Sequence, residues 1–154
     1  KGRASHIKAF LWRGQSMKLI TDLKQNCLEP ASVALGCFDG IHLGHQAVIG
    51  CAVADKPNGL TPSVFTFQEN PLQVLTGNTV PTLLAPDTRN QIFEEIGVEQ
   101  VFMPSFREVM NLEAEAFVHT VLKQYCKAEK VYCGFNFHFG KGRKNSNSLE
   151  KSTE

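Results

Sequence analysis

The sequence has 154 residues, of which 42% are hydrophobic and 20% are charged. These proportions are typical of one globular domain with an ordinary core. A formal net charge of +1 at pH 7 excludes a general electrostatic affinity for nucleic acid or anionic membranes, and the apolar runs are too short for a membrane-spanning helix. Any phosphate binding must therefore be local.

The cysteines indicate the compartment. Five of them, Cys27, Cys37, Cys51, Cys126 and Cys133, are scattered along the chain without a CxxC pair. An odd and scattered set argues against both a disulfide framework and a zinc site. Several fall in apolar segments, where cysteine acts as a small hydrophobic side chain. We therefore expect a reducing, cytoplasmic environment.

The first 16 residues differ from the rest of the chain. Residues 1–16 carry four basic side chains and no acidic one, and Met17 opens a more regular segment. The apolar stretch 9–12 is too short for the core of a signal peptide, so secretion is not expected. We expect 1–16 to be an extension outside the domain, with Met17 as the natural start. A short functional basic arm is the alternative.

The next elements are predicted from apolar patterns. Residues 32–35 form a short and mostly apolar run that includes the β-branched Val33, which predicts a buried strand. A helix follows, because small and apolar residues recur there at the spacing of one helical face. The predicted face consists of Gly44, Ala47, Val48, Cys51 and Ala52.

Strands and helices continue to alternate toward the carboxyl end. Strands are predicted at 63–67, 100–103 and 130–133, and helices at 87–97 and 117–125. Three strands that are each followed by a helix, and then a fourth strand, predict a parallel α/β sheet flanked by helices.

The segment from Gly36 to His45 joins the first strand to its helix and includes Gly40 and Gly44. It lies at the carboxyl end of the strand, where ligands of such sheets bind. Free backbone N–H groups and the positive end of a helix suit a phosphate. His42 and His45 can face the same phosphoryl group, as imidazolium or as neutral donors. The alternative for either histidine is that it only caps the helix.

The ten residues at 36–45, Gly-Cys-Phe-Asp-Gly-Ile-His-Leu-Gly-His, closely resemble the signature of the HxGH nucleotidylyltransferases. Their form is similar to that of the FAD synthetase module of bacterial bifunctional riboflavin kinase/FAD synthetases. Two further stretches match that family in order, Thr-Phe-Gln-Glu-Asn-Pro at 66–71 and Gly-Phe-Asn-Phe-His-Phe-Gly at 134–140. The resemblance implies a Rossmann-like nucleotidylyltransferase domain over 17–143, followed by a polar tail at 144–154.

This resemblance implies an FMN adenylyltransferase, which transfers AMP from ATP to FMN and releases FAD and pyrophosphate. It implies catalytic roles for His42, His45 and Asn136, and a Mg²⁺ ion held mainly by phosphate oxygens and water, with Asn136 and Asp39 as protein donors. The implied nucleotide-binding residues are Gly36, Phe38, Asp39, Gly40, Gly44, Asn70 and Arg143. Neither a nucleic acid nor a membrane is an expected partner.

Departures from the family pattern define the alternatives. Asn70 stands where the family usually has His, and Gln68 and Glu69 shift the acidic position. The family's later Ser-Ser-Thr segment and its riboflavin kinase domain do not occur in these 154 residues. We therefore expect the first part of a synthetase module, which binds nucleotide but converts FMN slowly or not at all. The alternatives are an inactive nucleotide-binding fragment and another HxGH nucleotidylyltransferase.

Two features near the carboxyl end have two interpretations each. Phe137, His138 and Phe139 alternate, so they fit either a packed hairpin or a ligand contact. Lys141 and Arg143 could hold a phosphate, or form part of a solvated basic cluster.

Overall fold

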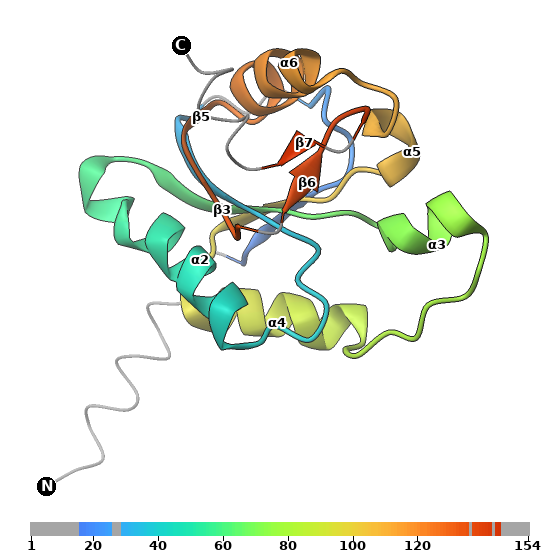
Figure 1. Cartoon of the computed structure of the whole chain (residues 1–154). Coiled ribbons are helices and arrows are strands. Elements are labelled where there is room, and N and C mark those ends of the chain that lie inside the picture. The colour runs from blue at the N-terminus through green and yellow to red at the C-terminus, as the bar shows by residue number, and fades with distance from the viewer. Residues whose placement is uncertain (1–15, 26–28, 136, 143, 146–154) are drawn as a thin grey trace, which may run out of the picture.

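A computed structural model of the chain describes residues 16–25, 29–135 and 137–142 and the backbone of 144–145. The predicted site residues Asn136 and Arg143 lie outside these residues, as do 1–15 and 146–154. A five-stranded parallel sheet forms the centre, with the strand order β1-β4-β3-β2-β5 (Figure 1). This confirms the predicted fold class. The strands are β1 (Lys18–Ile20), β2 (Ala31–Leu35), β3 (Thr61–Phe65), β4 (Gln100–Phe102) and β5 (Ala128–Cys133).

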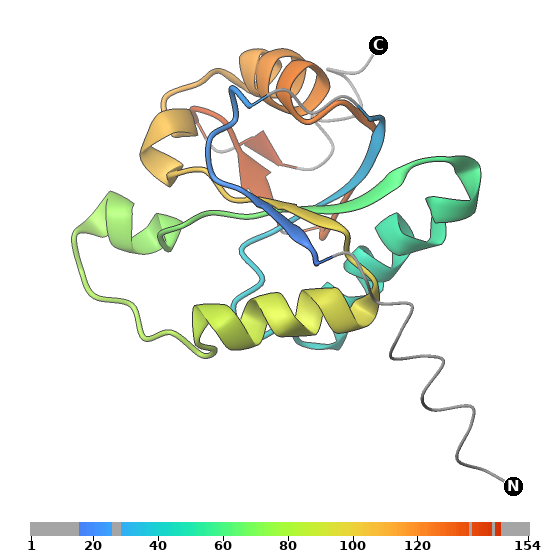
Figure 2. The same ribbon diagram turned by 180° about the vertical axis from the view of Figure 1, so that it is seen from behind.

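Helices cover both faces of the sheet (Figures 1 and 2). The helices α2 (Leu43–Ala54) and α4 (Pro86–Ile96) pack on one face. The other face is covered by α5 (Phe106–Val109), α6 (Ala114–Ala116) and the helical segment η2 (Phe117–Tyr125), together with a hairpin of β6 (His138–Phe139) and β7 (Lys144–Asn145). The short helices η1 (Lys56–Asn58) and α3 (Pro71–Thr76) follow α2 and β3.

The core has two layers because successive side chains of a strand point to opposite faces. Residues in register across β2, β3 and β4 share a face, and both faces are apolar, as expected for a buried parallel sheet. Ala34, Val64 and Val101 point toward α2 and α4, whereas Leu35, Phe65 and Phe102 point toward α6 and η2.

The order of the strands determines where a ligand can bind. The chain runs from β2 to its neighbour β3 and on to β4, then crosses to β5 on the opposite side of β2. The direction of winding therefore reverses at β2. Crevices at the carboxyl ends of strands next to such a reversal are the usual ligand sites of open α/β sheets. The loop 36–42 leaves β2 at this point.

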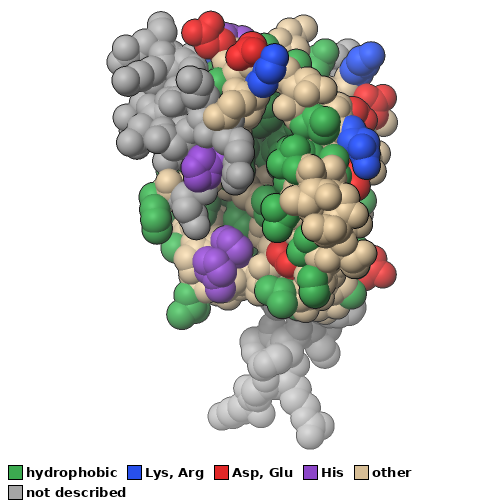
Figure 3. Space-filling model, turned by 45° about the vertical axis from the view of Figure 1, so that its right-hand side comes forward, with side chains coloured by type: hydrophobic (Ala, Val, Ile, Leu, Met, Phe, Trp, Pro, Cys, Tyr) green, Lys and Arg blue, Asp and Glu red, His purple; other side chains and the backbone are tan. Residues whose placement is uncertain are grey.

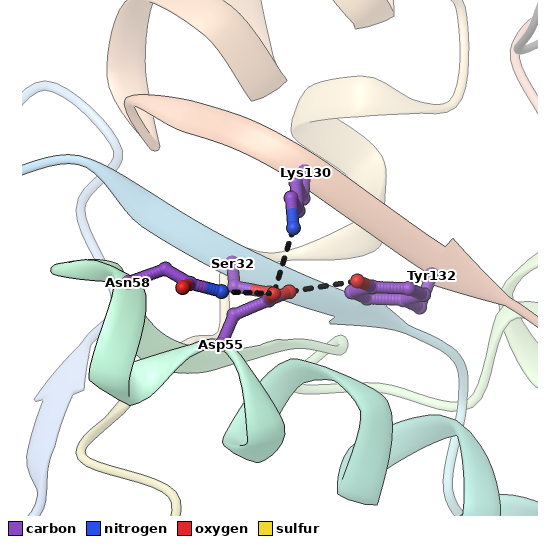
Figure 4. A network of polar contacts seen from close by, with 5 residues as sticks. All are labelled: Ser32, Asp55, Asn58, Lys130 and Tyr132. Atoms are coloured by element: carbon purple, nitrogen blue, oxygen red, sulfur yellow. Dashed lines mark hydrogen bonds and ion pairs between the residues drawn. The ribbon is translucent and has the colours of Figure 1, made fainter.

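The carboxyl end of α2 is fixed by a buried network around Asp55, which is 5% exposed (Figure 4). Its Oδ1 accepts hydrogen bonds from Lys130 Nζ at 2.8 Å and Asn58 Nδ2 at 3.3 Å. Its Oδ2 accepts from Tyr132 OH at 2.7 Å and Ser32 Oγ at 2.9 Å. The bonds from Lys130 and Tyr132 hold the pKa of Asp55 well below its ordinary value. The network joins α2 to β2 and β5.

Most predicted elements are confirmed, with corrections at their edges. The strand predicted at 63–67 is β3, which ends at Phe65 and not at Phe67. Its pairing with β2 stops there because β2 itself ends at Leu35. The helix predicted from Asp87 begins one residue earlier, at Pro86, since proline suits the first helical position. Strand β1 was not predicted, because three residues are too few to show a periodicity.

The predicted face of α2 is wrong in part. Ile49 and Ala52 are its buried residues, whereas Gly44, Ala47 and Cys51 are exposed. Nearly every position of α2 carries a small or apolar side chain, so the spacing alone could not identify the buried face.

Two absences hold for the part of the chain that the structure describes. It contains no helix long and apolar enough to cross a membrane. Of its cysteines, Cys37, Cys51 and Cys133 are free thiols.

Candidate active site

The loop between β2 and α2 has an unusual backbone. Phe38, Gly40 and Ile41 have positive φ angles of 50°, 85° and 41°. This conformation is rare for a bulky residue and rarer for a β-branched one such as Ile41. Such strain persists only where the surroundings impose it, and it is concentrated at functional sites.

The ring of Phe38 is one of the groups that impose it. It is buried and packs edge-on against Phe93 at 5.8 Å and against the ring of His45 at 5.3 Å. A Cβ at Gly36 would come within 2.8 Å of this ring, so only glycine fits there. The Gly36 N–H donates to the Phe65 carbonyl at 3.2 Å. The ring of Phe38 and this N–H are therefore engaged within the fold.

Side-chain hydrogen bonds hold the rest of the loop. Thr66 Oγ1 donates to the Cys37 carbonyl at 3.1 Å. The Leu83 N–H donates to Asp39 Oδ1 at 3.0 Å. A Cβ at Gly40 would come within 2.9 Å of Leu83 Cδ1. The loop between β2 and α2 is therefore held on one side by the segment before α4 and on the other side by the residue that follows β3.

His42 caps α2 with its own side chain. Its Nδ1 accepts from the backbone N–H groups of Gly44 at 3.1 Å and His45 at 3.4 Å. Because Nδ1 accepts, we assign the proton to Nε2, which remains a donor on an exposed ring. A Cβ at Gly44 would come within 3.0 Å of His42 Cε1, so glycine leaves room for this cap. The capping and ligand-binding interpretations of His42 are therefore compatible.

The rings of His42 and His45 stack at 3.6 Å with an interplanar angle of 22°. Burial lowers the pKa of His45, the neighbouring His42 lowers it further, and Asp39 opposes the shift. His45 Nδ1 is buried and has no hydrogen-bond partner in the described residues. A lowered pKa keeps His45 neutral at pH 7, so it offers a neutral N–H and not an imidazolium.

A pocket of about 400 Å³ adjoins the loop between β2 and α2. It opens between the carboxyl ends of β2 and β3 and the start of α4, and Asp39 lines it. On the face shown in Figure 3, exposed histidines border a hollow lined by apolar side chains. Polar side chains of the pocket include Asp39, Thr66, Gln68, Glu69, Asn70 and Arg89.

The loop after β3 supplies part of this pocket. Asn70 caps α3, since its Oδ1 accepts from the Leu72 N–H at 2.9 Å. Glu69 accepts from Ser105 Oγ at 2.7 Å and from the Phe106 N–H at 2.8 Å, which ties the loop to α5. Both residues have structural tasks, and the nucleotide contact of Asn70 stays a prediction.

The structure brings together His42, His45 and Asp39, and places Asn70 across the pocket. Asn136 and Arg143 lie outside the described residues. His138 is exposed on β6, and Phe139 is buried against Phe117, which supports the hairpin interpretation.

Arg89 was missed in the sequence. It lines the pocket from α4, three residues before Ile92 and four before the buried Phe93. A charged residue on the apolar face of a predicted helix was the signal that could have identified it.

A magnesium ion could use part of this site. The described residues contain no group of three or more His, Cys, Asp or Glu side chains arranged to hold a metal. Mg²⁺ often takes only one or two protein carboxylates and binds phosphates and water with its other positions. The Asp39 carboxylate lines the pocket with one oxygen hydrogen-bonded to Leu83, so it fits this arrangement.

The parallel sheet and the loop between β2 and α2 define a Rossmann-like α/β domain. The polar groups that remain available to a ligand lie next to β2, where the order of the strands reverses. A family model described as FAD synthetase matches residues 24–154. The chain belongs to the FAD synthetase family, which confirms the predicted resemblance.

Curated relatives are considerably longer than this chain. A bifunctional riboflavin kinase/FMN adenylyltransferase of Bacillus subtilis is 39% identical over 115 residues, covering 71% of this chain and 35% of that protein. A protein of the same description from Escherichia coli K12 is 29% identical over 133 residues, covering 82% of this chain and 42% of that protein. A crystal structure described as a macrolide-efflux protein from Streptococcus pneumoniae has a TM-score of 0.75 and 28% identity, covering 89% of this chain and 47% of that one.

Proposed function

We propose that this chain is an FMN adenylyltransferase module, which transfers AMP from ATP to FMN. The observation that carries the proposal is the stacked pair of His42 and His45 at the start of α2, on a strained loop at the switch point. Membership of the FAD synthetase family implies ATP and FMN as the substrates.

The reaction asks the protein mainly for positioning and for stabilisation of charge. An oxygen of the FMN phosphate forms a bond to the α-phosphorus of ATP. The bond from that phosphorus to the bridging oxygen breaks, and pyrophosphate leaves with the electron pair. The Nε2–H of His42, the N–H of His45 and the positive end of α2 would hold the phosphate oxygens of ATP.

A Mg²⁺ ion bound with ATP would neutralise part of the phosphate charge. We propose Asp39 and Asn136 as its protein ligands. Asp39 would also orient the loop, because its Oδ1 is held by the Leu83 N–H.

The relatives named above are bifunctional and carry a riboflavin kinase activity. Phosphorylation of riboflavin yields FMN, the proposed substrate of this chain. We propose that a riboflavin kinase partner supplies it, in the cytoplasm.

The test is to incubate the chain with FMN, ATP and Mg²⁺ and to separate the flavins by chromatography. We expect FAD and an equal amount of pyrophosphate, formed slowly. Equilibrium binding of ATP is measured on the same preparation. Tight ATP binding without any FAD would assign nucleotide binding alone to this chain, and the absence of both would contradict the proposal.

A further inference from the structure

Arg89 is a cation without an adequate partner. Its Nη2 donates to the thioether sulfur of Met103 at 3.2 Å, and its Nε is buried without a hydrogen-bond partner. Within the described residues no carboxylate forms an ion pair with it. A guanidinium has five N–H donors, and a thioether is a weak acceptor. Leaving such donors unmatched in a half-buried position is unfavourable.

The surroundings of Arg89 indicate what could satisfy it. Burial lowers the pKa of Arg89, while Asp39 and Cys37 oppose that shift from the same pocket. The pocket is about 400 Å³, is open to solvent and includes the amino-terminal residue of α4, Pro86. It therefore offers a bound anion a guanidinium and the positive end of an 11-residue helix together.

The location of the pocket favours one anion over another. Asp39 lines it, and the adjacent Phe38 packs its ring on His45. The histidine pair itself does not line it. Two phosphate-bearing substrates must meet in adenylyl transfer, and the histidines are assigned above to ATP. The pocket is thus the neighbouring place from which a second phosphate could approach.

We propose that Arg89 binds the phosphate monoester of FMN and thereby distinguishes FMN from riboflavin. This proposal rests on the function proposed above. A phosphate monoester carries about −1.5 to −2 charges at pH 7, and the planar guanidinium can donate two parallel hydrogen bonds to it. Riboflavin has no such group, so it gains nothing from Arg89.

The test compares Arg89→Met and Arg89→Lys with the wild-type chain, using FMN, riboflavin and ATP as probes. Flavin binding is measured by fluorescence quenching in a phosphate-free buffer, and ATP binding by calorimetry. In Arg89→Met we expect FMN affinity to fall roughly ten- to hundredfold, with riboflavin and ATP affinities unchanged. The FMN affinity of Arg89→Lys should lie between those of the wild type and Arg89→Met. Lysine keeps the charge but loses the planar guanidinium that donates two parallel hydrogen bonds.

Arg107→Met is the matched control, since Arg107 is exposed on α5 and does not line the pocket. It should leave all three affinities at the wild-type value. Thermal melting of each variant establishes that it is folded, and Arg89→Lys carries the test if Arg89→Met does not fold.

Three outcomes would overturn the assignment of Arg89. Equal losses for FMN and riboflavin would mean that Arg89 only shapes the pocket. A loss for ATP alone would mean that the anion belongs to ATP. Unchanged FMN affinity would mean that the phosphate binds elsewhere. By contrast, a wild-type chain that binds neither ATP nor FMN would contradict the proposed function as well.

Discussion

The polar groups at the two ends of helix α2 differ in how completely the protein satisfies their hydrogen bonds. At the carboxyl end, Asp55 accepts four hydrogen bonds from β2, β5 and the turn after α2. At the amino end, His42 is exposed, His45 has a buried nitrogen without a described partner, and the preceding loop is strained.

This difference in hydrogen bonding distinguishes polar groups that stabilise the fold from polar groups that are available to bind a ligand. Buried polar groups are nearly always satisfied in native proteins, so an exception needs a reason. At Asp55 the protein supplies every partner itself. At the histidines and at Arg89 the missing partner is, on our proposals, the phosphate of a substrate. Variants at the two ends should therefore affect different measurements.

Asp55→Ala should have the largest effect, and on stability. It removes the shared acceptor of Ser32, Lys130 and Tyr132, and the buried hydroxyl of Ser32 is left without a partner. Breaking a buried network of this kind should lower the melting temperature by about 10 °C. Circular dichroism during heating measures it.

The matched control for Asp55 is Lys56→Ala, one residue later. Lys56 pairs with Glu99 at the surface, where ion pairs contribute little. A melting temperature for Asp55→Ala as close to wild type as that of Lys56→Ala would contradict the structural role of the network.

The double variant His42→Ala/His45→Ala should act on ligand binding. Loss of one charge-assisted hydrogen bond to phosphate costs about 1.5–3 kcal/mol, which is roughly ten- to hundredfold in ATP affinity. Calorimetric titration with ATP measures it. His42→Asn is the control, because asparagine keeps a capping acceptor for α2 and removes the imidazole. It should preserve the melting temperature and still weaken ATP binding. Equal ATP affinity in the wild type, the double variant and His42→Asn would contradict the assignment of the ATP site to these histidines.

Sequence reasoning predicted the amino end of α2 far better than the carboxyl end. The loop and its histidines are contiguous, and they follow a strand that is visible from its apolar run at 32–35. The Asp55 network joins Ser32, 23 residues before, to Lys130, 75 residues after. Periodicity carries no information about such distant contacts, because they depend on which strands become neighbours in the sheet. The place of Arg89 on the apolar face of the helix predicted at 87–97 could have identified that residue, but not the pocket, whose walls come from three separate stretches of the chain.

Gly40→Ala should have a smaller effect, at the amino end. Gly40 has a φ of 85°, and an added Cβ would come within 2.9 Å of Leu83 Cδ1. A left-handed conformation costs a residue with a Cβ about 1–2 kcal/mol, so the melting temperature should fall by a few degrees. Gly50→Ala, inside α2, is the matched control. Nothing lies within 4 Å of its added Cβ, and it should stabilise the helix by about 0.5–1 kcal/mol. A stabilised Gly40→Ala would mean that the loop is not held as described.

The smallest expected effect is a pH dependence that separates the two ends of α2. The pKa of His45 is lowered from 6.5 in the folded chain, so below pH 6.5 the unfolded chain binds more protons than the folded one. Stability should therefore fall as the pH is lowered from 6.5. His45→Gln removes this titration, and the plot of its melting temperature between pH 7.5 and about 5 should be flatter than that of the wild type.

Asp55 behaves differently because its pKa lies below the ordinary 3.8 when folded. Its contribution is fully present above that value and is lost only as the pH falls further toward the folded pKa. Acid should therefore weaken the protein in two stages, first through the end of α2 that offers donors to a ligand and then through the end that holds the fold. Identical slopes for wild type and His45→Gln near pH 6 would show that His45 is not kept neutral by its surroundings. The proposal that His45 is a neutral donor to ATP would then fail, even if the affinity measurements supported the site.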